Sequence, residues 1–269
     1  MAMRAARWTP APLLKASAAL HVGAIALGLA RPSLWPWALG AVIANHVQLA
    51  ATGLWPRSTL LGPNLTRLPP AAARRGEVAL SIDDGPEPAV TPQVLNLLDE
   101  YRVKATFFCI GRRVEERAEL AREIVHRGHA VENHSYQHLN YFSLLGPRAL
   151  AYEIERAQAV IGAITGRRPV FFRAPAGLRS PLLDPVLARL DLLLASWTRR
   201  GFDSVNGDPE SVYARLVRGL AAGDILLLHD GHAAHTRSGT PVILEVLPRL
   251  LAAFAHCGLT PVRLSAALA

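Results

Sequence analysis

From residue 77 onward, short apolar runs alternate with segments of helical spacing. The runs expected to form strands are 78–82, 105–110, 130–132, 170–172, 192–197, 225–228 and 261–264. The segments with helical apolar spacing are 91–101, 113–127, 147–164, 209–221 and 240–254. Apolar strands alternating with helices indicate a parallel sheet buried on both faces. About seven such units predict an α/β fold, a distorted (β/α) barrel smaller than the usual eightfold one.

Two longer apolar stretches occupy the first 60 residues. One runs from 13 to 30 and contains Lys15, and the other runs from 33 to 55 without an acid, a lysine or an arginine. A helix that crosses a bilayer needs about 20 apolar residues, so the second stretch meets that length and the first is marginal. Because Arg31 and Pro32 leave only a tight connection, the two stretches predict an N-terminal hydrophobic helical hairpin.

The membrane topology of this region has three interpretations. In the favoured one, both helices span a bacterial inner (cytoplasmic) membrane, and cations at both outer ends place the following domain on the cytoplasmic face. In the second, residues 1–30 are a signal peptide, and in the third only 33–55 spans, which puts the domain outside. The expected organisation is membrane-anchoring segments over 1–60, a Pro/Ala-rich linker over 61–76 and the barrel domain over 77–269.

The net charge of +8 belongs to the N-terminal region. No acid precedes Glu77, and residues 1–76 carry eight Lys and Arg, whereas residues 77–269 carry 21 Lys and Arg against 21 Asp and Glu. A DNA-binding domain would carry its basic surface on the folded body, so nucleic acid is not an expected partner. The two cysteines form no disulfide framework.

Ionisable residues follow five of the predicted strands, where barrel enzymes gather their chemistry. These residues are Asp83 and Asp84, His134, Arg173, Asp203 and His229. His138 lies four residues after His134, and on a helical turn the two imidazoles would share a face and could hold one cation. The alternatives are a solvated turn at the aspartates and a chance histidine pair.

Five segments, in order, resemble the motifs of the polysaccharide deacetylase family (NodB homology, carbohydrate esterase family 4). They are Ser81-Ile82-Asp83-Asp84-Gly85-Pro86, His134-Ser135-Tyr136-Gln137-His138, Arg173-Ala174-Pro175-Ala176-Gly177, in part Gly201-Phe202-Asp203-Ser204, and Leu227-Leu228-His229. The resemblance covers roughly residues 77 to 265. It implies a distorted (β/α) barrel, in agreement with the alternation of elements.

The resemblance also implies roles. Asp84, His134 and His138 would bind a divalent metal ion, leaving positions open for water and substrate. Zinc is the expected ion, and cobalt, nickel or manganese would also suit these ligands.

The remaining implied roles belong to groups that act on the substrate. Asp83 would be the general base, neutralised and oriented by Arg173. The backbone N–H of Ala176 would help to stabilise the oxyanion. His229 would protonate the leaving amine or alcohol, with Asp203 as its orienting partner.

Two positions depart from the family pattern. Ala176 stands where an aromatic residue is usual, and Ser204 stands where a tryptophan usually follows the aspartate. In the family the two larger side chains wall the sugar subsite. Since both are shortened in this chain, we expect a wider pocket and a substrate other than a plain chain of N-acetylglucosamine. Aromatic residues that could line the pocket, or pack in the core instead, are Tyr136, Phe142, Trp197 and Phe202. His232 and His235 follow in a loop and are weaker candidates for substrate contact.

The chain is therefore expected to be a metal-dependent hydrolase that removes an N-acetyl or similar acyl group from a carbohydrate, on a lipid-linked or envelope glycan. The expected partners are a carbohydrate or glycolipid substrate and, through the N-terminal segments, a membrane. Two alternatives stay open, a deformylase of a lipid-carried sugar and a non-enzymatic glycan-binding barrel.

Overall fold

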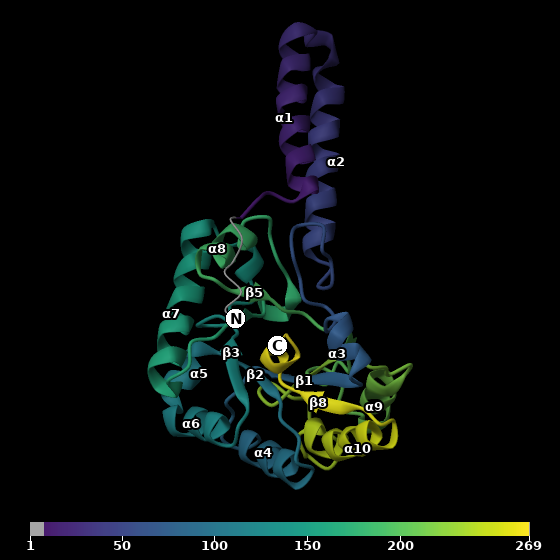
Figure 1. Ribbon diagram of the computed structural model, residues 1–269. Coiled ribbons are helices and arrows are strands. Elements are labelled where there is room, and N and C mark those ends of the chain that lie inside the picture. The colour runs from purple at the N-terminus through teal and green to yellow at the C-terminus, as the bar shows by residue number, and fades with distance from the viewer. Residues whose placement is uncertain (1–7, 269) are drawn as a thin grey trace.

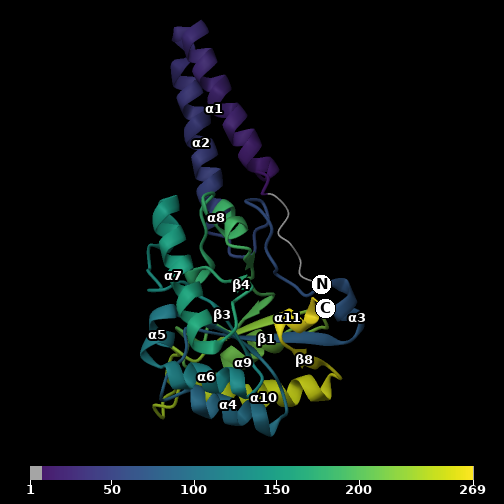
Figure 2. The same cartoon turned by 60° about the vertical axis from the view of Figure 1, so that its left-hand side comes forward.

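A helical hairpin projects from an α/β body in the computed structural model, which describes residues 8–268 (Figure 1). Helix α1 (Pro12–Ala30) is followed by a short 3₁₀ turn, η1 (Pro32–Leu34), and by α2 (Trp35–Gly53). The two helices lie side by side in both views (Figure 2). The predicted hairpin is therefore present, and the chain enters the body where α2 ends.

The body contains one parallel sheet. Its strands are β1 (Glu77–Asp83), β2 (Thr106–Cys109), β3 (Ala130–Asn133), β4 (Phe171–Phe172), β5 (Leu193–Leu194), β6 (Arg199–Arg200), β7 (Ile225–His229) and β8 (Thr260–Val262). The order is β5-β4-β3-β2-β1-β7-β6, and β8 pairs with the first half of β1. Every pairing is parallel, as the alternation predicts.

Helices connect these strands and cover the outside of the sheet (Figures 1 and 2). They are α3 (Pro70–Arg74), α4 (Thr91–Glu100), α5 (Gly111–Glu116), α6 (Ala118–His126), α7 (Pro147–Thr165), α8 (Leu183–Arg189), α9 (Pro209–Val217), α10 (Val242–His256) and α11 (Leu264–Ala267), with 3₁₀ turns η2 (Phe142–Leu144) and η3 (Pro175–Gly177). This arrangement confirms the distorted (β/α) barrel, in a curled form that its strands do not close.

The two edge strands of the sheet are neighbours in the chain. Only residues 195–198 separate β5 from β6, and so short a link spans at most about 18 Å. The sheet must therefore curl until its edges approach. Leu65, in the predicted linker, lies at this seam: its N–H donates to the Leu194 carbonyl, and its own carbonyl accepts from the Ser196 N–H, both at 2.9 Å. Residues 61–76 thus run along the barrel.

Alternation along β1 decides which of its residues face the barrel interior. Val78, Leu80 and Ile82 belong to the large apolar cluster between the sheet and the outer helices. Ala79 belongs to a second cluster with residues from the other strands. Because strand side chains alternate, Asp83, two positions beyond Ser81 and four beyond Ala79, is directed inward at the carboxyl end of the strand.

The sequence did not predict four helices and strands of the body, which are α3, α8, α11 and β6. Strand β6 is the charged pair Arg199–Arg200, and helix α8 lies in a region without a clear apolar period. In addition, the helix predicted over 113–127 is two helices, which meet at Arg117 in a non-helical conformation. Charged side chains on β6 carry no strand signal, since the pairing comes from backbone hydrogen bonds to β7.

The hairpin has a polar pair between its two helices and large apolar side chains on its outside. The Asn45 Nδ2 donates to the Ser17 Oγ across the two helices at 2.8 Å, and both side chains are buried. Large apolar side chains such as Ile25, Leu29 and Val47 are more than 60% exposed. A soluble helical pair shows the opposite distribution.

Among residues 8–268, α1 is the one helix that is long and apolar enough to cross a membrane by length and composition. The sequence-based expectation that 33–55 is the better membrane-spanning candidate and 13–30 the marginal one is therefore wrong. Helix α1 begins at Pro12 and reaches 19 residues, as long as α2. The polar residues Asn45, His46 and Gln48 make α2 the less apolar of the two.

Candidate active site

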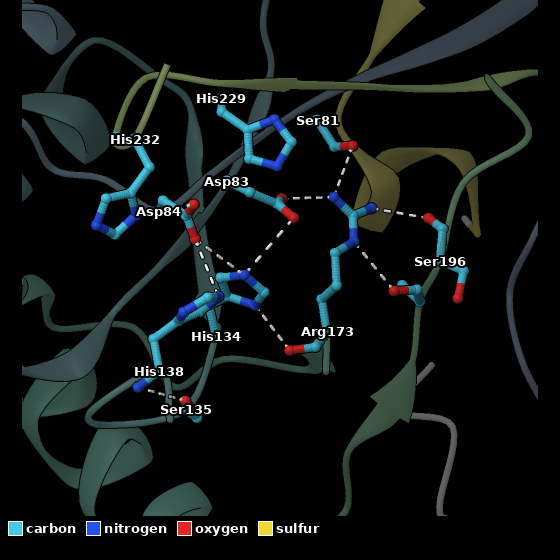
Figure 3. Close-up of polar contacts among 12 residues, drawn as sticks. Ser81, Asp83, Asp84, His134, Ser135, His138, Arg173, Ser196, His229 and His232 are labelled. Atoms are coloured by element: carbon cyan, nitrogen blue, oxygen red, sulfur yellow. Dashed lines mark hydrogen bonds and ion pairs between the residues drawn. The ribbon is translucent and has the colours of Figure 1, made fainter. Parts of the chain in front are cut away.

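Four strands of the sheet, β1, β3, β4 and β7, bring the predicted residues together. In the sheet register Asp83 is opposite His229, and Asn133, which precedes His134, is opposite Phe172, which precedes Arg173. The carboxyl ends of parallel strands meet at one edge, so these side chains converge there. Figure 3 shows them around one space, with Asp83 between Arg173 and the histidines.

Asp84, His134 and His138 form a cluster that could hold a metal ion, because one ligand atom from each lies within 4.8 Å of the others. The Asp84 Oδ1 lies 3.3 Å from the Nε2 of both histidines and is buried without a hydrogen-bond partner in the described chain. The His134 Nδ1–H donates to the Arg173 carbonyl at 2.8 Å. This bond leaves the Nε2 lone pair free toward the cluster, as in metal-ligating histidines. The donor set fits a divalent cation.

Charge interactions set the protonation of these ligands. Burial raises the pKa of Asp84, but the neighbouring imidazoles of His134, His232 and His138 outweigh it and hold the pKa well below its usual range. Burial and the neighbouring His134 lower the pKa of His138 to about 4. Burial also lowers the pKa of His134, but Asp83 and Asp84 raise it by more, so the pKa of His134 is raised overall. At neutral pH Asp84 is an anion and His138 is neutral.

The second carboxylate, Asp83, is held by a buried arginine. The Arg173 Nη1 donates to the Asp83 Oδ1 at 2.6 Å and to the Ser81 Oγ at 2.9 Å. Its Nε and Nη2 donate to backbone carbonyls of residues 195 and 196, and its guanidinium lies 4.0 Å from the centre of the Phe108 ring. Arg173 is therefore fixed in position. The other oxygen of Asp83 lies 3.7 Å from the His134 Nε2 and faces the cluster.

His229 and Asp203 form a buried pair on the opposite side. The His229 Nδ1–H donates to the Asp203 Oδ1 at 2.9 Å, and the His229 backbone N–H donates to the Oδ2 at 2.6 Å. Burial lowers the pKa of His229, but the charge and hydrogen bond of Asp203 outweigh it and raise the pKa to about 9. The Asp203 carboxylate thus fixes the ring, leaves Nε2 free toward the pocket and favours the protonated form.

Ala176 contributes a backbone N–H at the rim of the pocket. It lies in η3 with φ of 54°, and its N–H has no backbone partner in the described residues. Left-handed φ values are costly for residues other than glycine and gather at functional sites. Asp84, Ser135, His138 and His232 share this conformation. Strained backbone is thus concentrated around the predicted site.

The expectation that His134 and His138 lie on a helical turn is wrong. Strand β3 ends at Asn133, and the following residues form a loop in which Ser135 and His138 have positive φ. The Ser135 N–H donates to the Asn133 Oδ1, and the His138 N–H donates to the Ser135 Oγ. These side-chain bonds replace the helical ones. The imidazole rings still meet, with centroids 4.8 Å apart.

His232 joins the site more directly than its sequence position indicates. Its Nδ1–H donates to the Asp84 Oδ2 at 3.2 Å, and its Nε2 accepts from the Arg113 Nη2 at 3.1 Å. Arg113 also donates to the Asp84 carbonyl. His232 therefore orients the Asp84 carboxylate from outside the cluster, and Arg113 holds His232 and the Asp84 backbone. No motif signals this contact, since it depends on the fold of the loop after β7.

The pocket over the cluster is about 120 Å³ in volume, below the 300–1,000 Å³ of typical ligand pockets. The side chains of Trp197 and Arg200 line this space together with Ala176 and Ser204, and the prediction of a pocket wider than is usual in the family stays a prediction. Of the four candidate aromatic residues, Trp197 lines the pocket. Tyr136 and Phe142 are buried outside its lining.

Comparison with known proteins identifies the family. The family model described as polysaccharide deacetylase matches residues 71–194. A peptidoglycan-N-acetylglucosamine deacetylase of Bacillus cereus is 35% identical over 176 residues, which cover 64% of this chain and 81% of that protein. The chain belongs to the polysaccharide deacetylase family.

Two further relatives show the range of the family. A chitooligosaccharide deacetylase of Azorhizobium caulinodans is 35% identical over 158 residues, covering 58% of this chain and 75% of that protein. The crystal structure of a mutant of a carbohydrate esterase family 4 pseudoenzyme, with restored enzymatic activity, is similar at a TM-score of 0.68 and 26% identity. That match covers 77% of this chain and 71% of the other.

Proposed function

We propose that the chain is a metal-dependent deacetylase that hydrolyses an N-acetyl or similar acyl group on a carbohydrate of the cell envelope or of a lipid carrier. The observation that carries this proposal is the placement of Asp83 between a fixed cation, Arg173, and the cluster of Asp84, His134 and His138. A base beside a cation site, with the His229–Asp203 pair opposite, is the arrangement that amide hydrolysis requires. The named activities of the relatives agree with it.

In this mechanism Asp83 accepts a proton from water as the water oxygen forms a bond to the acyl carbon. The Ala176 N–H donates to the oxygen on which negative charge develops. The carbon–nitrogen bond then breaks as the His229 Nε2–H gives its proton to the leaving nitrogen. The products are a carboxylic acid and a free amine, and the proton on Asp83 returns to His229 through solvent.

A divalent ion held by Asp84, His134 and His138 would supply Lewis-acid polarisation of the acyl group and of the water. Arg173 keeps Asp83 facing that site. His232 holds the Asp84 carboxylate in place, and Arg113 holds His232 and the Asp84 backbone carbonyl.

The first test measures acyl release by the full-length chain in detergent. We expect zinc- or cobalt-dependent release of acetate from N-acetylated chito-oligosaccharides or from a lipid-linked sugar extract. Formate release from the lipid extract instead would favour the alternative, a deformylase of a lipid-carried sugar, which the small pocket over the cluster also accommodates. A chain that binds metal stoichiometrically and releases neither acid would be a glycan-binding barrel, consistent with a family that contains a pseudoenzyme.

We further propose that the hairpin inserts into the bacterial inner membrane. Its length supports this, since the 19 residues of α1 extend about 28 Å, close to the thickness of a bilayer core. Trp8 and Trp55 flank the base of the hairpin, and Trp35 and Trp37 lie near its tip, all more than 40% exposed. Tryptophan favours both membrane interfaces. With the flanking cations, this arrangement favours a barrel on the cytoplasmic face.

The pH profile tests the role of His229. In Asp203→Asn the charge that raises the His229 pKa is removed, so the alkaline limb of kcat/KM should move to lower pH by at least about one unit. A bound cation, Asp83 and Asp84 affect the His229 pKa in both the wild type and the variant. The difference between the two pH profiles therefore measures the effect of the Asp203 charge alone. The pKa of His229 is higher in the folded chain than in the unfolded chain. Protonated His229 therefore stabilises the metal-free fold fully below about pH 6.5, and this stabilisation is lost as the pH rises through about 9. Coincident profiles would remove His229 as the proton donor.

A further inference from the structure

A second cavity lies between the base of the hairpin and the barrel. Its volume is about 710 Å³, and it shares two wall residues, Trp197 and Arg200, with the pocket over the metal-ligand cluster. Trp55, Pro56 and Arg57, directly after α2, form one side, and residues of β6 and α9 form the other. The cavity therefore connects the end of the proposed membrane segment to the candidate active site.

The lining of this cavity is cationic. Five arginines contribute to it and no acid does; they are Arg57, Arg199, Arg200, Arg215 and Arg218. Arg199 is neutralised by Asp224 and donates to two backbone carbonyls. Within residues 8–268 the other four form no ion pair. Since residues 77–269 are neutral overall, this concentration of unpaired charge is local.

Arg200 lies at the junction of the two cavities. Its Nε is buried and has no hydrogen-bond partner among the described residues. Its guanidinium lies 4.9 Å from the centre of the Phe202 ring and 5.4 Å from that of Trp197, and Arg215 approaches the same Phe202 ring at 5.5 Å. Stacking on aromatic rings holds a guanidinium in position while leaving its N–H groups free. An unused buried donor indicates that a ligand completes the site.

We infer that this cavity binds the phosphate or diphosphate of a lipid-linked sugar, whose acyl group is then hydrolysed in the neighbouring pocket. Arginine pairs with phosphate through two parallel hydrogen bonds. A ligand anchored here would keep its lipid chain beside the hairpin, and its sugar would extend past Trp197 and Arg200. The inference rests on the proposed deacylase function and names its substrate class.

The test measures equilibrium binding to the full-length chain in phosphatidylcholine nanodiscs, so it does not depend on catalysis. The probes are farnesyl diphosphate, farnesol and inorganic pyrophosphate. We expect farnesyl diphosphate to bind, farnesol to bind at least tenfold more weakly, and the affinity to fall with added salt. Each of Arg57→Gln and Arg215→Gln should weaken binding about fivefold, and Arg215→Gln/Arg218→Gln at least tenfold.

The control is Arg122→Gln, which removes an exposed arginine from α6 and should leave the affinity unchanged. Equal binding by the wild type and the double variant would overturn the inference. Equal affinity for inorganic pyrophosphate and farnesyl diphosphate would also overturn it, since the site would then recognise free phosphate. If phosphatidylglycerol displaced bound farnesyl diphosphate as effectively as added farnesyl diphosphate does, the cavity would be reassigned to bulk phospholipid headgroups, which would overturn the inference. Absence of acyl release with intact arginine-dependent binding would instead count against the proposed chemistry alone.

Discussion

Asparagine at position 83 is expected to lower kcat/KM by about 10³-fold while leaving metal binding intact. The Asp83 carboxylate is the group that would accept the proton of water, and general-base catalysis contributes roughly 10²–10⁴-fold. Asparagine keeps the shape and one oxygen for the Arg173 hydrogen bond, but it cannot accept a proton at neutral pH. The candidate metal-binding cluster, formed by Asp84 and the two histidines, keeps all of its ligand atoms.

The matched control is Asp230→Asn, a second buried carboxylate at the same edge of the sheet. Asp230 accepts from the Thr91 hydroxyl and the Gly231 N–H and does not line the pocket over the cluster. Burial raises its pKa to about 7, so the charge removed is only partly present at neutral pH. We expect its kcat/KM to stay within a few-fold of the wild type.

Stability must be measured beside these rates. Removing one partner of a buried ion pair costs up to about 3–5 kcal/mol, and Arg173 and Asp83 are both buried. Thermal unfolding and metal content of Asp83→Asn decide whether a lost rate reflects chemistry. A folded, metal-loaded variant with wild-type kcat/KM would remove Asp83 as the base.

Much of the fold could be predicted from the sequence because most of the barrel strands lie in short apolar runs. Strand β7, at 225–229, is a run of isoleucine and leucine that ends in His229, and β1 ends at the aspartates in the same way. A buried parallel strand carries this signal along its own length. The residue that follows such a strand is therefore placed by local sequence alone.

The parts that sequence reasoning missed depend on contacts between distant segments. Strand β6 is an arginine pair recognised only by its pairing with β7. His232 reaches Asp84 across 148 positions, and Arg57 meets the barrel at the Thr198 carbonyl. The conformation of 134–138 was mispredicted because local side-chain bonds compete with helical ones. The spacing of His134 and His138 in the sequence cannot distinguish a loop from a helical turn.

Loss of the His134 imidazole should abolish both metal binding and hydrolysis. His134 is 2% exposed, and its ring is oriented by the Arg173 carbonyl, so its Nε2 is fixed at the cluster. With only Asp84 and His138 left, His134→Ala should retain less than a tenth of the bound zinc of the wild type. Chelation of the wild type should abolish acyl release in the same way, with recovery on adding zinc or cobalt. The variant should not recover.

Thermal unfolding provides a readout of this site that does not require a substrate. An ion that binds only the folded chain stabilises it by about 4 kcal/mol at a thousand times its Kd, so zinc should raise the Tm of the wild type. The metal-free wild type keeps the Asp84 Oδ1 buried without a hydrogen bond in the described chain, a cost that the ion relieves. His134→Ala should show no zinc-dependent rise, whereas His126→Ala, a control on α6, should show the full one. Equal rises in both variants would place the metal elsewhere and would separate His134 from the site.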